Sequence, residues 1–231
     1  MLIFIDKRIP DSAKQKLVVY GDLIEVESSG IVYDSISGHP DIFLCQSRNQ
    51  LIIAPNTPIY LINKLKTKGV NFVIGEKSLS NNYPSTSHYN AVISNNYLIH
   101  NLKYTDNTII NQIGDRQQIN VKQSYTRCNL IEISENVFIT SDKAIYNKIN
   151  KLQGNTIFFI DPVQISLPGH SYGFFGGCCG LFNNKLFILG CLDYLKEKFA
   201  LVNFTEKSGV EIIELTENQL FDGGGIFFIE N

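Results

Sequence analysis

Short apolar segments recur along the chain, and polar or glycine-rich residues precede each of them. They begin 49, 39, 51 and 45 residues apart, at Asp41, Asn90, Asn129, Gly180 and Gly225. Each segment predicts a short β-strand, and four of them lead through a loop that contains asparagine into a second apolar strand. The pattern therefore indicates one β-hairpin that is repeated along the chain.

The fifth hairpin is divided between the two ends of the chain. Its first strand is the apolar run at residues 226–229, and its second strand is the run at residues 1–5. The hairpin loops are predicted at residues 47–50, 94–96, 134–136 and 183–184, with the fifth at residues 230–231 followed by Met1. Antiparallel pairing of the terminal strands would close the chain into a ring.

A helical segment follows each hairpin, and a third apolar strand follows each helix. Cap residues, apolar stripes and terminal glycines predict helices at 57–69, 105–114, 141–154, 192–207 and 11–21. A ββαβ unit cannot bury its strand face alone, so five units are expected to pack around a common axis. We expect a single α/β domain over residues 1–231, with units near 41–83, 90–122, 129–161, 180–216, and 225–231 together with 1–27.

Composition excludes several partners and compartments. A net charge of −2, a pI near 6.1 and the lack of any block of like charges argue against nucleic acid and against an anionic membrane surface. The first apolar run stops at Asp6 and no run reaches about 18 residues, so we expect a cytoplasmic protein without a membrane segment. Five cysteines, an odd number, are expected to be reduced thiols.

Candidate chemistry gathers in the five segments that precede the hairpins, which we call the pre-hairpin segments. A fivefold arrangement brings them together at one end of the axis, where histidine, cysteine and acidic residues for thiol catalysis would meet. These segments are residues 38–41, 87–90, 125–129, 176–180 and 221–225.

Five ββαβ units in a pseudo-fivefold array resemble the pentein fold, an α/β propeller, over the whole chain. This is the fold of guanidino-group-modifying enzymes such as arginine deiminases, agmatine deiminases and amidinotransferases. The resemblance implies an acid in an [Asp/Glu]-Gly-Gly segment, a histidine in a His-x-Asp segment two units later, and a nucleophilic cysteine in the next unit. One rotation of the ring follows that order, with Asp222, His88 and Cys128 in these places.

The same order decides against other candidates. His39 is set aside as the family histidine because the next unit offers no cysteine. Cys178 and Cys179 are set aside as nucleophiles because the preceding pre-hairpin segment holds no histidine. The family's His-x-Asp reads His88-Tyr89-Asn90 here, and the cysteine lies far from the C-terminus, so the resemblance implies a circularly shifted relative.

The resemblance implies a covalent mechanism on a small guanidine-like or amidine-like compound. The Cys128 thiolate would attack the guanidinium carbon, His88 would protonate the departing amine and activate water, and Asp222 would orient the histidine or bind the substrate. Substrate-binding positions are expected among the neighbouring pre-hairpin residues, namely Asn90, Arg127, Asn129, His39, Asp41, Gly177 and Cys178.

Other interpretations stay open. Cys128 before an apolar strand also fits a small core residue, and Asp222 before three glycines also fits a turn. Residues 173–180 lack the lysine and helix of a phosphate loop, and His170 with two adjacent cysteines has poor spacing for a metal, so we expect neither a metal nor a cofactor. The alternative functions are a noncatalytic pentein that binds a large partner, as a ribosome anti-association factor does, or a sensor of small ligands.

Overall fold

The computed structural model describes residues 1–47 and 50–230 and contains five three-stranded sheets of the same design. In each sheet the central strand pairs antiparallel with one neighbour and parallel with the other. The predicted ββαβ repeat is confirmed. Four sheets, in chain order, consist of β3 (Leu44–Ser47), β4 (Gln50–Ile53) and β5 (Phe72–Ile74); β6 (Val92–Ile93), β7 (Tyr97–His100) and β8 (Gln117–Asn120); β9 (Leu130–Ser134), β10 (Val137–Thr140) and β11 (Thr156–Phe159); and β12 (Cys179–Phe182), β13 (Lys185–Ile188) and β14 (Glu211–Glu214).

The remaining sheet joins the two ends of the chain. β1 (Leu2–Asp6) pairs antiparallel with β15 (Phe227–Ile229), with Ile3 opposite Phe228, and parallel with β2 (Asp22–Val26). The terminal strands therefore form the divided hairpin that the apolar pattern predicts.

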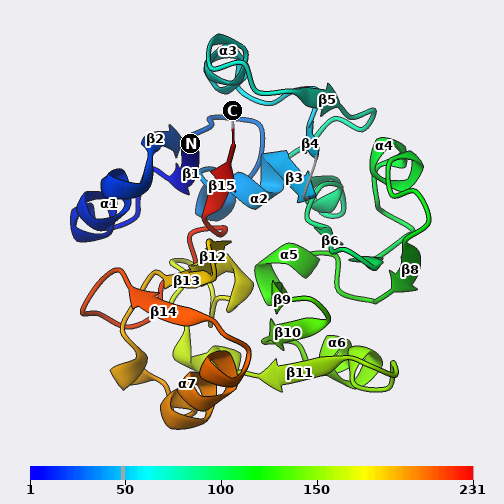
Figure 1. Ribbon diagram of the computed structural model, residues 1–231. Coiled ribbons are helices and arrows are strands. Elements are labelled where there is room, and N and C mark those ends of the chain that lie inside the picture. Colours follow the sequence, from blue (N-terminus) through cyan, green and yellow to red (C-terminus); the bar gives the residue numbers. More distant parts are fainter. Residues whose placement is uncertain (48–49, 231) are drawn as a thin grey trace.

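A helix covers each parallel connection, because two parallel strands need a crossover between them. Figure 1 shows the five sheets around a common centre, with these crossover helices at the periphery. They are α1 (Asp11–Leu17), α3 (Ile59–Thr67), α4 (Asn107–Asn111), α6 (Lys143–Ile149) and α7 (Lys198–Lys207). The sheets remain separate, and across the described residues no sheet continues around the centre.

Hydrogen bonds connect the pre-hairpin segments of neighbouring units around the centre. Each bond joins one segment to the next, so these five polar segments lie together. The bonds run from Asp41 N to Gly224 O, Asn90 Nδ2 to Asp41 O, Thr126 N and Arg127 N to Asn90 O, Arg127 Nη1 to Gly176 O, and Gly225 N to Gly177 O.

Two predicted strand starts are helical turns instead. Asp41 lies in α2 (Pro40–Phe43) and Asn129 ends α5 (Thr126–Asn129), and the strands begin one to three residues later. Pro40 favours the first turn because its fixed φ suits a helix and no N–H is left without a partner. In α5 the first two N–H groups both bond the Asn90 carbonyl.

Helix ends also differ from the prediction. The cap of α6 is Asp142, whose Oδ1 accepts the Ile145 N–H at 2.8 Å, and not Ser141. The helix predicted at 192–207 is a 3-10 turn, η6 (Leu192–Tyr194), followed by α7, and the one predicted at 105–114 contains only α4. The loops predicted at 47–50 and 230–231 include residues that lie outside the described ranges.

Apolar side chains from strands and helices fill the space within and between the units. Phe4, Phe43, Phe138 and Phe187 are fully buried, so each of four sheets contributes or adjoins a large core side chain. Over residues 1–47 and 50–230, no helix has the length and hydropathy needed to cross a membrane.

Candidate active site

Cys128 borders a cavity of about 150 Å³ at the centre of the molecule. The cavity is formed mainly by aromatic and aliphatic side chains, and its polar lining includes His39 and Asp222. Cys128 itself lies in the short helix α5, which places its thiol at the cavity wall. The aromatic lining comes from Tyr33, Tyr125, Tyr172 and Phe174.

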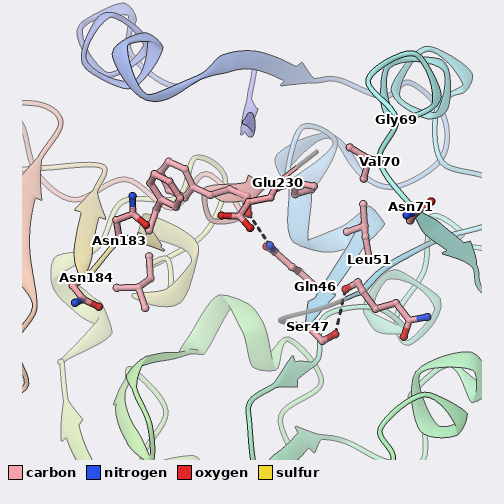
Figure 2. Close-up of a pocket in the computed structure, with 14 residues that line it drawn as sticks. Gln46, Ser47, Leu51, Gly69, Val70, Asn71, Asn183, Asn184 and Glu230 are labelled. Atoms are coloured by element: carbon pink, nitrogen blue, oxygen red, sulfur yellow. Dashed lines mark hydrogen bonds between the residues drawn. The ribbon is translucent and has the colours of Figure 1, made fainter.

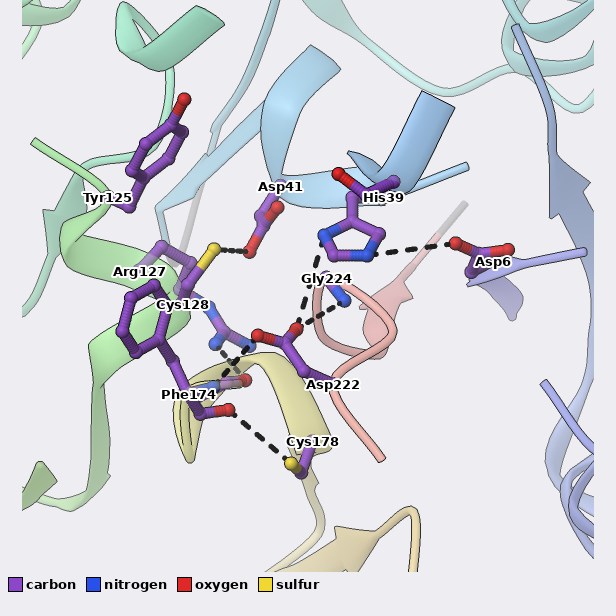
Figure 3. A network of polar contacts seen from close by, with 12 residues as sticks. Asp6, His39, Asp41, Tyr125, Arg127, Cys128, Phe174, Cys178, Asp222 and Gly224 are labelled. Atoms are coloured by element: carbon purple, nitrogen blue, oxygen red, sulfur yellow. Dashed lines mark hydrogen bonds and ion pairs between the residues drawn. The ribbon is translucent and has the colours of Figure 1, made fainter. Parts of the chain in front are cut away.

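The Cys128 sulfur has two polar neighbours. Its Sγ lies 2.8 Å from Asp41 Oδ2, and the thiol donates to that carboxylate (Figure 3). Asn90 Nδ2 lies 3.2 Å from the same sulfur and donates to it. Cys128, Asp41 and Asn90 come from three different units, so the contact depends on the arrangement of the units around the centre.

Asp41 is a fully buried carboxylate. Burial raises its pKa from 3.8 to about 6, and the charge of the nearby His39 opposes that rise. Its second oxygen, Oδ1, is buried and has no hydrogen-bond partner among the described residues. Buried polar atoms are usually paired, so this oxygen is an unused acceptor among the described residues, and Asp41 itself is not one of the residues that line the cavity.

The His39 imidazole lies between two carboxylates. Its Nδ1 is 4.0 Å from Asp222 Oδ1 and its Nε2 is 3.9 Å from Asp6 Oδ2 (Figure 3). Both ring nitrogens are buried, and neither has a hydrogen-bond partner in the described part of the chain. Asp6 is itself paired with Arg8, whereas Asp222 borders the cavity. The ring is thus placed to exchange a proton with a group in the cavity.

Backbone N–H groups hold the Asp222 carboxylate. Oδ1 accepts from Gly224 N at 3.0 Å and Oδ2 accepts from Phe174 N at 2.9 Å, while burial raises the pKa of the group. A side chain at Gly177 would overlap Asp222 Oδ1, and one at Gly224, where φ is +69°, would overlap His39. The glycines on both sides therefore allow the close approach that packs Asp222 beside His39.

Burial and nearby charges keep the Cys128 thiol protonated. Burial, and then the negative charges of Asp41 and Asp222, raise its pKa well above the usual value. A cation in the cavity would lower the pKa of the thiol, because a nearby positive charge stabilises a thiolate.

His88 does not border the cavity that Cys128 borders. Its Nδ1 lies 2.6 Å from the Tyr104 carbonyl oxygen and donates to it, and burial lowers the pKa of the half-buried ring. The structure brings His39 together with Cys128 and Asp222.

Arg127 joins two units instead of bordering the cavity. Its Nη1 and Nη2 donate to the carbonyls of Gly176 and Cys179 at 2.8 and 3.1 Å, and its guanidinium lies over the Phe227 ring. The arginine therefore holds α5 against the neighbouring pre-hairpin segment.

Three further predicted residues lie beside the cavity without lining it. Asn129 donates to the Tyr125 carbonyl and accepts from Ser141. The Gly177 carbonyl accepts two N–H groups of the glycine-rich segment 223–225, and the buried Cys178 Sγ lies 3.4 Å from the Phe174 carbonyl. No cluster of three or more histidine, cysteine or acidic residues that could hold a metal ion occurs within the described ranges.

The sequence analysis did not identify the cavity walls that come from the segments before α2 and before β12. These segments supply Tyr33, Leu167, His170 and Tyr172, and the Ser35 hydroxyl bridges them by lying 2.8 Å from His170 Nε2. Their length was the available signal, because long connections between regular elements often carry function.

A larger cavity lies elsewhere and offers different chemistry. It measures about 740 Å³ and is lined by ends of strands and loops that include Gln46, Asn71 and Asn183 (Figure 2). Its described lining contains neither histidine nor cysteine. Of these two cavities, only the smaller central one has a cysteine in its described lining.

A family model described as "Family of unknown function (DUF6873)" matches residues 4–227. The chain belongs to this family. A search of curated proteins found no match.

Solved structures of guanidino-modifying enzymes share the fold. A DDAH mutant from Pseudomonas aeruginosa, complexed with citrulline, is 9% identical over 88% of this chain and 78% of that chain, with a TM-score of 0.55. C. jejuni agmatine deiminase is 10% identical over 87% and 73%, with a TM-score of 0.53. Inosamine-phosphate amidinotransferase from Streptomyces griseus is 9% identical over 94% and 78%, also with a TM-score of 0.53. The predicted pentein fold is confirmed.

Proposed function

We propose that this protein is a cysteine-dependent hydrolase or amidinotransferase-like enzyme that acts on a small guanidine-like or amidine-like compound. The observation that carries the proposal is the buried contact between the Cys128 thiol and Asp41, beside a His39 ring whose two nitrogens have no hydrogen-bond partner among the described residues. A nucleophile, a carboxylate and an acid–base group at one cavity form the set that covalent catalysis needs.

The carboxylates favour a planar cation as the substrate. Guanidinium and amidinium groups present several N–H donors in one plane, which pair with carboxylate oxygens. Asp41 Oδ1 has no hydrogen-bond partner within the described chain, and Asp222 borders the cavity. The volume of about 150 Å³ is below the roughly 300 Å³ at which drug-sized sites begin, so the reacting part of the substrate is small.

In the first half-reaction the sulfur forms a bond to the central carbon of the substrate. The Cys128 proton passes to Asp41 Oδ2, and the thiolate adds to the amidinium carbon. His39 in its protonated form then donates a proton to the departing nitrogen as the C–N bond breaks. The products of this half-reaction are an amine or ammonia and a thiouronium or thioimidate adduct on Cys128.

In the second half-reaction neutral His39 takes a proton from the acceptor that attacks the adduct. With water as the acceptor, the C–S bond breaks, the thiolate leaves and a urea or amide product forms. With an amine as the acceptor, the amidino group is transferred. In both cases Cys128 recovers its proton from Asp41, so the enzyme returns to its initial state.

The cavity lining also indicates which groups the rest of the substrate carries. The described lining contains no lysine or arginine to pair with a substrate carboxylate. Tyr33, Tyr172 and Leu167 instead form an aromatic and aliphatic wall. We therefore expect methylguanidine and agmatine to be better substrates than arginine.

Product formation tests the proposal. Wild-type protein is incubated with methylguanidine, agmatine, arginine and acetamidine, with and without an amine acceptor, and ammonia, ureido products and transfer products are measured. Cys128→Ser is the matched control, because it exchanges only the sulfur for oxygen and removes the thiolate. We expect products from at least one compound and none with the serine variant. Turnover that persists in Cys128→Ser would exclude the covalent mechanism.

A further inference from the structure

The side chain of Asn90 contacts Cys128 through both of its polar atoms. Its Oδ1 accepts the Cys128 backbone N–H at 3.1 Å, and its Nδ2 lies 3.2 Å from the Cys128 sulfur. Nδ2 also lies 3.2 Å from the Asp41 carbonyl oxygen. The amide is fully buried and belongs to the unit between those of Asp41 and Cys128.

The orientation of this amide follows from its partners. A backbone N–H can only donate, so the oxygen of the amide must face Cys128 N and the nitrogen must face the sulfur. The Asp41 carbonyl can only accept, which requires the same orientation. Two independent partners therefore direct an N–H donor at the Cys128 sulfur.

An N–H donor at the sulfur also determines where the thiol proton points. The amide nitrogen cannot accept a proton, so the S–H bond is directed at Asp41 Oδ2, which lies 2.8 Å from the sulfur. When that proton leaves, the N–H group of Asn90 stays in place and now bonds a thiolate. Hydrogen bonds to a charged acceptor are stronger than those to a neutral one.

We propose that Asn90 is a positioning residue that directs the thiol proton of Cys128 toward Asp41 and stabilises the thiolate that forms. This inference rests on the proposed function, because it assigns a role within the same site. It differs from substrate binding, since both polar atoms of the Asn90 side chain already have partners in the protein.

An aspartate at position 90 would raise the pKa of the Cys128 thiol, whereas the asparagine lowers it. Asp41 and Asp222 already raise the pKa of the Cys128 thiol, whereas the Asn90 hydrogen bond lowers it. A carboxylate of the same shape would add a negative charge at the sulfur and remove the N–H donor. The uncharged amide therefore suits a nucleophile that has two carboxylates near it.

The backbone contact of Asn90 is separate from its side-chain role. Its carbonyl oxygen accepts the N–H groups of Thr126 and Arg127, which docks α5 on this unit. Substitution of the side chain leaves that carbonyl in place. A change in thiol ionisation can thus be separated from a loss of docking.

The test measures ionisation of Cys128 without any substrate. Ultraviolet thiolate absorbance is titrated in wild type, Asn90→Asp, Asn90→Ala and Asn129→Asp, with the signal of the corresponding Cys128→Ser double variant subtracted. Asn129 is the matched control, because it is a buried asparagine of α5 whose side chain bonds Tyr125 and Ser141 and not the sulfur. Thermal melting confirms that each variant is folded.

We expect Asn90→Asp to raise the thiol pKa by about one unit or more, which lowers the thiolate fraction at a fixed pH about tenfold. Asn90→Ala should also raise the thiol pKa, but by a smaller amount. Asn129→Asp should change the thiol pKa less than either Asn90 variant does. If Asn90→Asp does not fold, Asn90→Ala decides. An unchanged thiol pKa in the folded Asn90 variants overturns the inference.

The outcome is separable from that of the proposed function. If no guanidino or amidino compound is turned over but the Asn90 variants shift the thiol pKa, the proposed reaction fails and the positioning role stands. If turnover occurs and the thiol pKa does not depend on Asn90, only the positioning role is rejected.

Discussion

The buried carboxylate of Asp41 links the stability of the protein to the chemistry of its site. The folded protein holds the Asp41 proton more tightly than the unfolded chain, because burial raises the pKa of this group from 3.8 to about 6. Between these two pH values the folded state binds more protons than the unfolded state, so stability falls as pH rises. Above about pH 6 Asp41 is ionised in both states, so the free energy of unfolding stays lowered by the full amount.

Asp41→Asn should therefore be more stable than wild type at neutral pH and less active. The charge is removed, and the amide oxygen can still accept the hydrogen bond of the thiol, so we expect a gain of roughly 1–3 kcal/mol that disappears below about pH 4. Turnover should fall at least about 100-fold, since the proton acceptor for Cys128 is lost. Thermal melts across pH and product assays check both, with the exposed Asp115→Asn as control. A variant less stable than wild type at neutral pH contradicts this account.

The two short helices at the centre, α2 and α5, determine how the reacting residues meet. Each contains only four residues, and each presents a residue that contacts the other, Asp41 from α2 and Cys128 from α5. Arg127 fixes α5 by bonding the carbonyls of Gly176 and Cys179 in the next unit. The helix is thus held by contacts between units more than by its own turn.

Arg127→Lys should weaken the connection between α5 and the next unit, although lysine carries the same charge as arginine. A lysine has one ammonium group and cannot bond both carbonyls in the fork geometry of arginine, and it stacks less well on Phe227. We expect a loss of about 2 kcal/mol and a melting temperature lower by roughly 4–8 °C.

Arg116→Lys is the matched control, because Arg116 bonds the Ser94 and Ile113 carbonyls within a single unit. Both variants should lower stability, but only Arg127→Lys should also slow alkylation of Cys128. Equal effects on Cys128 reactivity would show that Arg127 does not position α5.

The helices and strands could be predicted from the sequence where a local pattern of apolar and polar residues defines them. The hairpins follow from apolar runs and from loop asparagines, and Asn136, Asn183 and Asn184 do adopt the positive φ that asparagine tolerates. The turns at α2 and α5 could not be predicted, since four residues are too few for a helical period.

The candidate site could also be predicted only in part, because its residues come from units that are far apart in the sequence. Cys128 and Asp222 were identified by the order of units, and both line the central cavity. His39 was excluded by that order, although His39-Pro40-Asp41 matches the His-x-Asp pattern without change. Three-dimensional packing decides which units face each other across the centre. The spacing of the units along the chain does not give that information.

At the scale of the whole molecule, the two ends of the chain form one structural element. β15 supplies an edge strand to β1, and residues 226–229 are nearly fully buried. The same segment follows Asp222 and Gly224, the glycine that borders His39. The terminal hairpin therefore supports both the fold and the site, and we infer that it closes the ring of units.

Deletion of residues 226–231 should abolish the cooperative thermal transition. The deletion removes β15 and exposes the apolar surface of β1, whose side chains are fully buried in the intact chain. Deletion of residues 230 and 231 alone is the control, because it leaves the β1 and β15 pairing intact. An unchanged melting temperature after the longer deletion would refute ring closure.

The reaction of the five thiols with a matched pair of electrophiles tests the central claim most directly. Chloroacetamidine carries a cationic amidinium group, and chloroacetamide is its neutral counterpart of nearly the same shape. Peptide mass spectrometry resolves the rate at each cysteine, including Cys191, the only one of the five that is not buried. We predict that the amidine modifies Cys128 at least about tenfold faster than the amide does, and that Asp41→Asn removes this preference. Equal rates for the two reagents at Cys128, or modification of Cys191 alone, would contradict an amidinium-binding thiol site.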